Sequence, residues 1–244
     1  FASPDKVIET MISKIFLFGN RAVKIYKWRK EFFGDLSDIS FRKSFIPEDF
    51  FWNNTMSPQI YTELIPYKTK DGRWVMSKID DANDFCIVMN KIESNNTVTY
   101  LAERQELEPG ILKDLTKTIL LKQREITTAR RKDLSSMLNK DLREIEREAL
   151  EDLRSWAYIG SDYISKEKTD CVVNRLLTIL DNPEYITWTK KARKSALIDA
   201  NGDNIIIGTD KSIQFIDILP PKLNWRVEDE AMNIGRVAAD VSAL

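Results

Sequence analysis

Histidine is absent from the 244 residues of this chain, and cysteine occurs only twice. The lack of histidine excludes Ser-His and Cys-His catalysis, histidine-ligated zinc and the usual general base at neutral pH. Cys86 and Cys171 have no paired metal-type spacing and do not make a disulfide scaffold. Any catalysis must therefore use carboxylates, lysine and a hard metal ion, and a reducing cytoplasm is the expected location.

Long apolar runs and an excess of one charge are missing as well. No stretch approaches the roughly 20 apolar residues that a membrane-spanning helix requires, and the N-terminal sequence FASPDKVIET lacks the pattern of a signal peptide. The 37 basic and 38 acidic residues nearly cancel, so no net field attracts nucleic acid or an anionic membrane. We therefore expect a cytoplasmic protein with neither a nucleic-acid nor a membrane partner.

Strand-like runs are concentrated before residue 92. The composition is 43% hydrophobic, which is enough for a sizeable core. Residues 12–27, ISKIFLFGNRAVKIYK, contain two apolar runs separated by Gly19 and Asn20, a pair suited to a tight hairpin turn. A short helix is predicted over residues 40–55, with Pro47 near its start or at a kink.

Three further strand-like runs follow this helix, with a turn at residues 70–72 between the first two. They cover residues 61–67, 74–79 and 85–92. Together with the hairpin and the helix, they predict a small β-rich lobe over residues 1–92.

The rest of the chain, residues 93–244, has a different character. A polar connector leads into a stretch rich in Leu, Glu, Lys and Arg, which predicts mostly helix as far as Leu180. We expect the helical character to end near Asn182 and Pro183, and apolar runs after Ser195 predict short strands. The predicted fold class is α+β with two lobes, residues 1–92 and a mainly helical second lobe.

One late segment, IDANGDNIIIGTDKSIQFID, carries the residue types of a phosphoryl-transfer centre. Asp199 is followed five positions later by Asn204, and Asp217 comes at the end of the second of two apolar strands. Phosphoryl transfer requires a carboxylate that orients a hydroxyl and oxygen ligands that hold magnesium. Turn formation is the competing explanation, because Asp, Asn and Gly all favour turns.

Lys24 lies on the second strand of the predicted hairpin, where alternation puts Val23 and Ile25 on one face and Lys24 on the other. A lysine at this position is either solvent-facing or, as in kinases, a phosphate contact that pairs with an acid from the helix of the lobe. Glu48 and Asp49 both lie in the predicted helix. The sequence leaves open which of the two pairs with Lys24.

Three segments of the predicted N-terminal lobe are ETMISKIFLFGNRAVKIYK, FFGDLSDISFRKSF and NNTMSPQIYTELIPY. They resemble the N-terminal lobe of bacterial aminoglycoside phosphotransferase-like kinases. Further on, FCIVMNKI resembles the strand that enters the hinge between lobes, LIDANGDNIII the catalytic loop, and WRVEDEAMNIGRVAADV the helix after the metal-binding Asp. The matches follow the family's order over most of the chain, which is more specific than any single motif.

The resemblance implies a two-lobed protein-kinase-like fold that binds ATP and magnesium. It assigns the phosphate anchor to Lys24 and the catalytic carboxylate to Asp199. Asp49 is the candidate partner of Lys24 from the predicted helix, with Glu48 as the alternative. The other assigned positions are magnesium ligands, Asn204 and Asp217, and residues lining the adenine pocket, Met89, Lys91 and Ile92.

The catalytic loop also departs from the family's pattern. Leu197 and Ile198 stand where the family has His-Gly, and Asn201 replaces its second histidine. Two functions therefore stay open. One is an ATP- and magnesium-dependent phosphotransferase that acts on a hydroxyl of a small molecule, and the other is a non-catalytic or weakly active nucleotide-binding module. The identity of the acceptor lies outside what the sequence determines.

Overall fold

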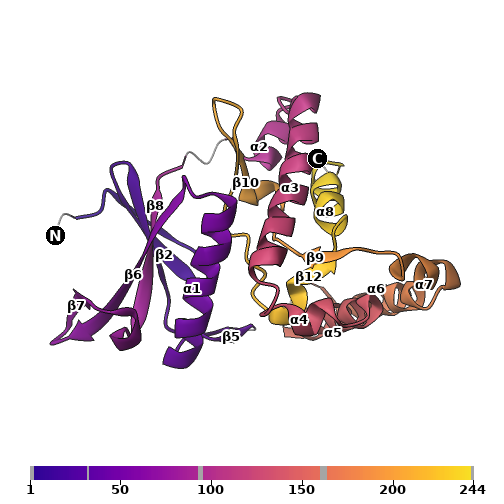
Figure 1. The fold of residues 1–244 in the computed structure, drawn as a ribbon, viewed down its shortest axis with the longest axis horizontal. Helices are drawn as coiled ribbons and strands as arrows, with labels where there is room; N and C mark the ends of the chain where they lie inside the picture. Colours follow the sequence, from indigo (N-terminus) through magenta and orange to yellow (C-terminus); the bar gives the residue numbers. More distant parts are fainter. Residues whose placement is uncertain (1–2, 32, 93–95, 160–163, 243–244) are drawn as a thin grey trace. The chain divides into compact units, whose positions relative to one another are not determined.

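The computed structural model describes residues 3–31, 33–92, 96–159 and 164–242 (Figure 1). The chain is an α+β protein in which an N-terminal antiparallel six-stranded sheet precedes a mainly helical region. The start of the predicted polar connector, residues 93–95, lies outside the described residues.

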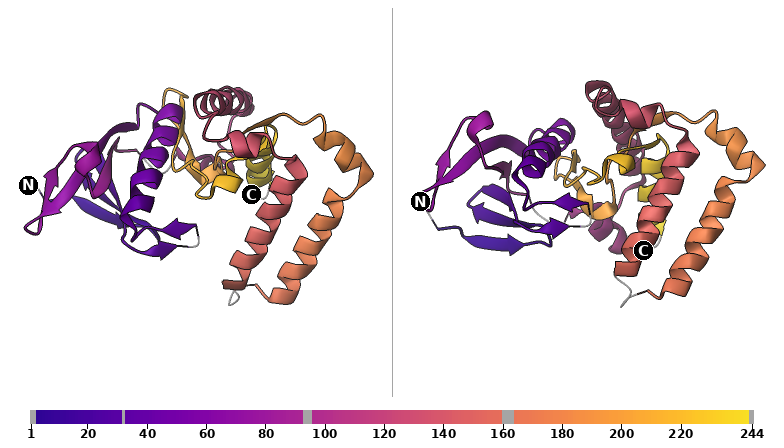
Figure 2. Two further views of the ribbon diagram at one scale, coloured as in Figure 1. Left: turned by 60° about the horizontal axis from the view of Figure 1, so that its bottom comes forward. Right: turned by 90° about the horizontal axis from the view of Figure 1, so that it is seen from below.

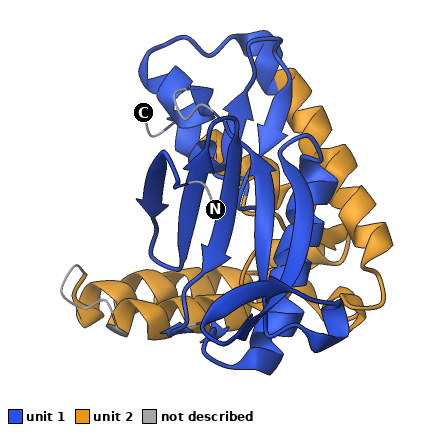
Figure 3. Ribbon diagram, turned by 90° about the vertical axis from the view of Figure 1, so that its left-hand side faces the viewer, with its two compact units in different colours: residues 1–112, 200–219, 240–244 blue, residues 113–199, 220–239 orange. Residues whose placement is uncertain are grey.

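Contacts between residues divide the chain into two compact units (Figure 3). The first unit comprises residues 1–112, 200–219 and 240–244, and the second comprises residues 113–199 and 220–239. The chain therefore enters and leaves each unit more than once. A division into folding domains at residue 92 stays a prediction.

The first unit contains the six-stranded sheet and one long helix, α1 (Ile39–Met56). Across the sheet the strands are β1 (Lys6–Glu9), β2 (Ser13–Phe18), β3 (Arg21–Tyr26), β8 (Asp84–Asn90), β6 (Tyr61–Lys70) and β7 (Arg73–Met76). Helix α1 packs against β8 and β6. The smaller elements of this unit are β4 (Lys30–Glu31), β5 (Gly34–Asp35), η1 (Ile79–Asp81), α2 (Val98–Glu103), η3 (Gly202–Asn204), β10 (Ile205–Ile207) and β11 (Ile213–Phe215).

The hairpin predicted over residues 12–27 is confirmed as β2 and β3. Phe18 pairs with Arg21, so the turn has two residues, and Gly19 adopts a φ of 54°. A side chain is disfavoured at this φ, which explains the glycine. The turn between β6 and β7 also has two residues, and both of them, Asp71 and Gly72, have positive φ.

Helix α1 confirms the predicted helix and turns a mixed polar and apolar face toward the core. Its buried residues recur every three or four positions: Arg42, Phe45, Ile46, Asp49, Trp52, Asn53 and Met56. The helix starts at the Asp38 cap, whose carboxylate accepts from the Phe41 amide. Pro47 lies well inside the helix, not near its start, so one intrahelical hydrogen bond is missing and packing of the buried face holds the helix together.

Arg42, on this face of α1, forms a buried ion pair with Asp84. Its guanidinium donates to both oxygens of Asp84, at 2.9 and 2.6 Å, and to the carbonyls of Leu36 and Tyr26. The hydroxyl of Tyr67 donates to Asp84 as well, at 2.7 Å. The arginine thereby ties the start of α1 to β8 and to the end of β3.

The second unit is mainly helical. Its elements are α3 (Pro109–Ala129) and α8 (Met232–Ser242), each mostly within it, with α4 (Ser135–Leu138), α5 (Leu142–Ile159), α6 (Lys166–Leu180), α7 (Pro183–Thr189), β9 (Lys194–Ala196), η4 (Leu223–Trp225) and β12 (Val227–Asp229). Helices α5 and α6 run side by side (Figure 2). Among the described residues, none of the helices has the length and apolar character needed to cross a membrane.

The predicted end of helical structure near Asn182 and Pro183 is wrong, because α7 begins there. The Asn182 side chain accepts from the Glu184 amide, and Pro183 occupies the first helical position. Asparagine as a cap followed by proline is a favoured way to start a helix. A pair of residues that breaks one helix here starts the next.

Buried carboxyl groups gather where β12 meets α5 in the second unit. Glu146, Glu228 and Asp229 are all buried, and the hydroxyl of Tyr185 donates to Glu146. Burial raises the pKa of Glu228 to about 8, with Glu146 and Asp229 adding to the effect. Glu228 is therefore largely protonated at neutral pH.

We expect the Arg42→Met variant to lower the free energy of unfolding by about 3–5 kcal/mol, because it leaves the Asp84 carboxylate buried without a counter-charge. Replacing both partners, Arg42→Met with Asp84→Leu, should regain part of this loss. Lys43→Met is the control, since this neighbouring side chain is exposed and should cost under about 1 kcal/mol. Urea unfolding measures all three, and equal losses for Arg42→Met and Lys43→Met would contradict the expectation.

Glu228 should make the stability of the protein fall with rising pH. The folded chain keeps a proton on Glu228 that the unfolded chain, with an ordinary pKa of 4.5, loses. The contribution of protonated Glu228 to stability is fully present below the unfolded pKa and is lost as the pH rises through about 8. Between the two pKa values the free energy of unfolding falls by about 1.4 kcal/mol for each pH unit. Thermal melts between about pH 5 and pH 9 should show a smaller decline for Glu228→Gln than for wild type.

Glu230→Gln is the matched control for this measurement. Arg124 lowers the pKa of Glu230 through a hydrogen bond and charge attraction, so its removal should leave the alkaline decline in place. A Glu228→Gln protein that declines as steeply as wild type would show that Glu228 is not the responsible group.

Candidate functional site

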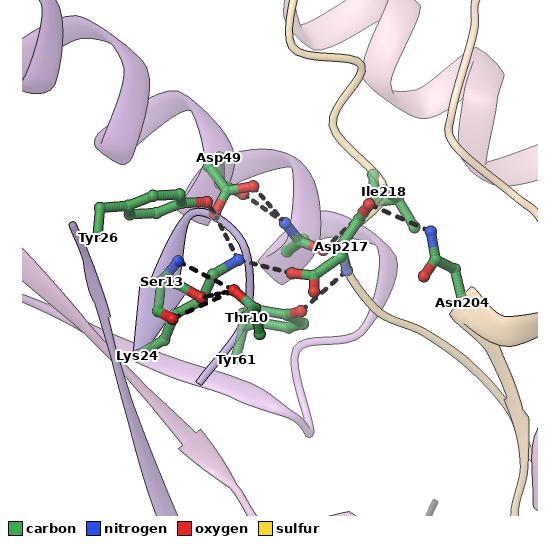
Figure 4. Close-up of polar contacts among 10 residues, drawn as sticks. Thr10, Ser13, Lys24, Tyr26, Asp49, Tyr61, Asn204, Asp217 and Ile218 are labelled. Atoms are coloured by element: carbon green, nitrogen blue, oxygen red, sulfur yellow. Dashed lines mark hydrogen bonds and ion pairs between the residues drawn. The ribbon is translucent and has the colours of Figure 1, made fainter. Parts of the chain in front are cut away.

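Lys24 is the centre of a polar cluster inside the first unit. On β3, alternation turns Ala22, Lys24 and Tyr26 toward the buried face, and the lysine is only 4% exposed. Its Nζ lies 2.6 Å from Oδ1 of Asp217 and 3.6 Å from Oδ2 of Asp49 (Figure 4). The alternation predicted for this strand is confirmed, and the lysine is on the interior face rather than in solvent.

Asp49 reaches Lys24 from the buried face of α1. Its carboxylate also accepts from the Tyr26 hydroxyl at 2.8 Å and from Nδ2 of Asn53 at 2.9 Å. Glu48 turns instead to the indole of Trp52, at 2.7 Å. Helical geometry decides between the two acids, because neighbours on a helix point about 100° apart and only Asp49 shares the face of Asn53.

In this cluster, burial and the attraction between opposite charges shift the pKa values of Lys24 and Asp49 in opposite directions. Burial by itself lowers the pKa of the Lys24 ammonium, but the carboxylates of Asp217 and Asp49 outweigh it and raise that pKa well above its usual value. Burial raises the pKa of Asp49, and Lys24 opposes that rise. Lys24 is therefore a permanent cation, and its counter-charges come from two different parts of the chain.

Asp217 follows β11 in a left-handed backbone conformation, with a φ of 50°. Its side chain is 48% exposed although Lys24 contacts one carboxylate oxygen. The Asn204 side chain donates to the Asp217 carbonyl at 3.4 Å, and Asn201 caps the short turn that carries Asn204 by accepting from its amide. Both predicted magnesium ligands thus lie next to each other in the first unit.

This donor set suits magnesium. A carboxylate and a side-chain amide supply hard oxygen ligands, and magnesium completes its shell with waters and phosphate oxygens. Within the described part of the chain, no group of three or more acidic, cysteine or histidine side chains could enclose a metal ion, but magnesium beside a nucleotide does not need such a cage. Asp217 and Asn204 would hold it.

The predicted adenine-lining residues lie at and just beyond the end of β8. Met89 is buried and pairs with Ala22, two positions from Lys24 on the same face of the sheet. Lys91 is exposed and donates its amide to the Asn20 carbonyl at 2.9 Å, while Ile92 is half-buried. Of these three residues, Met89 is therefore the one whose strand pairing places it on the same face of the sheet as Lys24.

Asp199 belongs to the second unit, whereas Lys24, Asp49, Asn204 and Asp217 all belong to the first. In its own unit Asp199 accepts from the Arg236 guanidinium at 2.8 Å. The amide of the preceding residue, Ile198, donates to Asn233 at 3.1 Å. The segment that carries Asp199 is therefore anchored to α8.

Sequence reasoning missed four buried polar residues of the site: Tyr26, Asn53, Ser57 and Tyr61. Ser57 Oγ accepts from the Phe215 amide, Tyr61 Oη from the Asp217 amide and Asn53 Oδ1 from the Ile218 amide. A signal was present for Asn53, which lies four residues after Asp49 on the same face of the predicted helix. Ser57 and Tyr61 lie beyond that helix, where its period no longer applies.

We expect Lys24→Met to lower the free energy of unfolding by about 3–5 kcal/mol, because Asp49 would stay buried without its cation. Adding Asp49→Asn should restore part of the loss. Lys14→Met, on the neighbouring strand, removes an exposed lysine with a long 3.8 Å contact to Glu9 and should cost under about 1 kcal/mol. Chemical denaturation provides the comparison, and a Lys24→Met protein as stable as Lys14→Met would refute the role of the buried charge.

The chain matches no model of a protein family and no curated protein sequence. The geometry around Lys24 is accordingly the basis on which a function can be assigned.

Proposed function

We propose that this protein is an ATP- and magnesium-dependent phosphotransferase that acts on a hydroxyl of a small molecule, with a two-lobed protein-kinase-like fold similar to that of the aminoglycoside phosphotransferase-like kinases. The observation that carries the proposal is the ion-pair geometry of buried Lys24, which contacts both Asp49 of α1 and Asp217 after β11. Phosphoryl transfer needs this combination of a cation and a metal-binding carboxylate, since catalysis rests on positioning and charge stabilisation.

Lys24 would contact the nucleotide phosphates. It is held by two carboxylates, of which Asp49 is almost fully buried and Asp217 is half exposed. Asp217 is thus the partner that can turn to a metal ion, while Asp49 keeps Lys24 charged and in place. Bound magnesium would offset the charge of the phosphates.

Asp199 would orient the acceptor hydroxyl, as its place five residues before Asn204 suggests. The hydroxyl oxygen would bond to the γ-phosphorus, the bond between that phosphorus and the bridging oxygen of ADP would break, and the hydroxyl proton would pass to the Asp199 carboxylate. A carboxylate serves this role in kinases that lack any other base at the acceptor.

Two contacts favour a second candidate, a nucleotide-binding module without catalysis. Arg236 already pairs with Asp199, at 2.8 Å, so an acceptor hydroxyl would compete with the guanidinium for this carboxylate. The amide of Gly19, at the tip of the β2–β3 hairpin, already donates to the Asp5 carboxylate at 2.6 Å. Both groups would have to exchange partners before they could serve a bound nucleotide and acceptor.

Thermal unfolding with and without Mg-ATP tests the proposal. A ligand at 100 times its Kd stabilises the folded state by about 2.7 kcal/mol, so wild type should melt at a higher temperature with Mg-ATP. Asp217→Ala should abolish this shift. Asp199→Ala should keep it while losing ADP production in the presence of a hydroxyl acceptor. Asp203→Ala, an exposed acid of the same loop, is the control and should behave as wild type.

The outcomes separate the candidates. A wild-type protein with no Mg-ATP shift would overturn nucleotide binding altogether. A shift without ADP production, lost in Asp217→Ala, would select the non-catalytic module. Full turnover in Asp199→Ala would remove Asp199 from the reaction.

A further inference from the structure

The segment around Asp217 has every backbone amide from residue 215 to residue 218 engaged. Ile216 donates to the Asn204 carbonyl at 2.9 Å. The other three donate to side chains: Phe215 to Ser57 at 2.6 Å, Asp217 to Tyr61 at 3.0 Å and Ile218 to Asn53 at 3.1 Å. Backbone amides are usually satisfied by backbone carbonyls or water, so three side-chain acceptors in four residues constitute a dedicated support.

The three acceptors come from one short stretch of chain. Asn53 lies on the buried face of α1, Ser57 caps the C-terminus of that helix, and Tyr61 begins β6. All three are essentially inaccessible to solvent. A buried amide that loses its acceptor destabilises the folded chain, so each of them constrains the segment that it holds.

The constraint matters because Asp217 has a φ of 50°. The left-handed region is unfavourable for a residue with a side chain, although Asp tolerates it better than most. Hydrogen bonds at Asp217 itself and at Ile218 offset this cost. In this conformation the Asp217 carboxylate meets Lys24 on one side and solvent on the other (Figure 4).

Asn53 also connects the two carboxylates of the cluster. Its Nδ2 donates to the Asp49 carboxylate at 2.9 Å, while its Oδ1 accepts from the Ile218 amide. One side chain therefore positions Asp49 and Asp217 relative to each other, and through them Lys24. A change at Asn53 would disturb both anchors, whereas Tyr61 touches Asp217 through a single hydroxyl.

We propose that Asn53, Ser57 and Tyr61 are positioning residues that hold Asp217 in its left-handed conformation and so direct its carboxylate toward a bound metal ion. The proposal rests on the proposed function, because it concerns the metal-dependent part of nucleotide binding. Lys24 and the adenine-lining residues contribute in the absence of metal. Loss of a positioning residue should therefore reduce the gain in ATP affinity that magnesium provides, and not the affinity measured without it.

The test is calorimetric titration of ATP into wild type and Tyr61→Phe, once with magnesium and once with EDTA. Tyr61→Phe should lower the magnesium-dependent gain at least tenfold while changing the affinity in EDTA by less than twofold. Tyr67→Phe is the matched control. It removes a buried hydroxyl from the same strand, one that contacts Asp84 and not residues 215–218, and should retain the wild-type gain.

A gain retained by Tyr61→Phe would overturn the positioning role while leaving the proposed function intact. Equal losses of ATP affinity with magnesium and with EDTA, or an equal loss of the gain in Tyr67→Phe, would show that the three residues only support the structure. Either result would also overturn the positioning role. No ATP binding by wild type would overturn the proposed function and this inference with it.

Amide hydrogen exchange gives a second readout that needs no ligand. In Tyr61→Phe the Asp217 amide should exchange at least tenfold faster than in wild type, and in Ser57→Ala the same should hold for Phe215. Tyr67→Phe should change neither rate. Unchanged exchange at Asp217 in Tyr61→Phe would show that the hydroxyl does not hold this backbone.

Discussion

Lys24 carries its charge inside the first unit, where an ammonium without a counter-charge would be unstable by several kcal/mol. The contacts to Asp49 and Asp217 meet this requirement and join strand β3, helix α1 and the segment after β11. None of the three can shift without exposing or unpairing a charge. The Asp217 side chain stays half exposed, which is where the proposed metal ion would reach it.

Helix α1 shows how the fold uses polar residues in its interior. Arg42, Asp49 and Asn53 lie on the buried face of the helix, each with specific partners. Because each of these side chains has its own partners, the contacts favour one alignment of the helix on the sheet. That alignment determines where Asp49 meets Lys24 and where Asn53 meets the Ile218 amide.

The two functional candidates share the cluster around Lys24 and differ in how Asp199 behaves. In the second unit Asp199 pairs with Arg236, and α8 anchors the preceding amide through Asn233. An arginine that pairs with the Asp199 carboxylate competes with a substrate hydroxyl but also fixes the orientation of the carboxylate. Under the proposed function, nucleotide binding would depend on the first unit, whereas transfer would depend on whether Asp199 exchanges Arg236 for a hydroxyl. Nucleotide binding and catalysis would then be separable properties.

Local patterns in the sequence determined the β2–β3 hairpin around Gly19, the helix over α1 and the alternation at Lys24, because turn chemistry and periodicity depend on neighbouring residues. Tertiary structure decided that the Lys24 face is the buried one and that Asp49 is its partner on α1. It also decided the left-handed backbone of Asp217, whose amide is held by Tyr61 from 156 positions away. The periodicity of a sequence identifies the two faces of a helix or strand. It does not determine which distant segment covers each face, because that depends on burial and charge pairing over the whole unit.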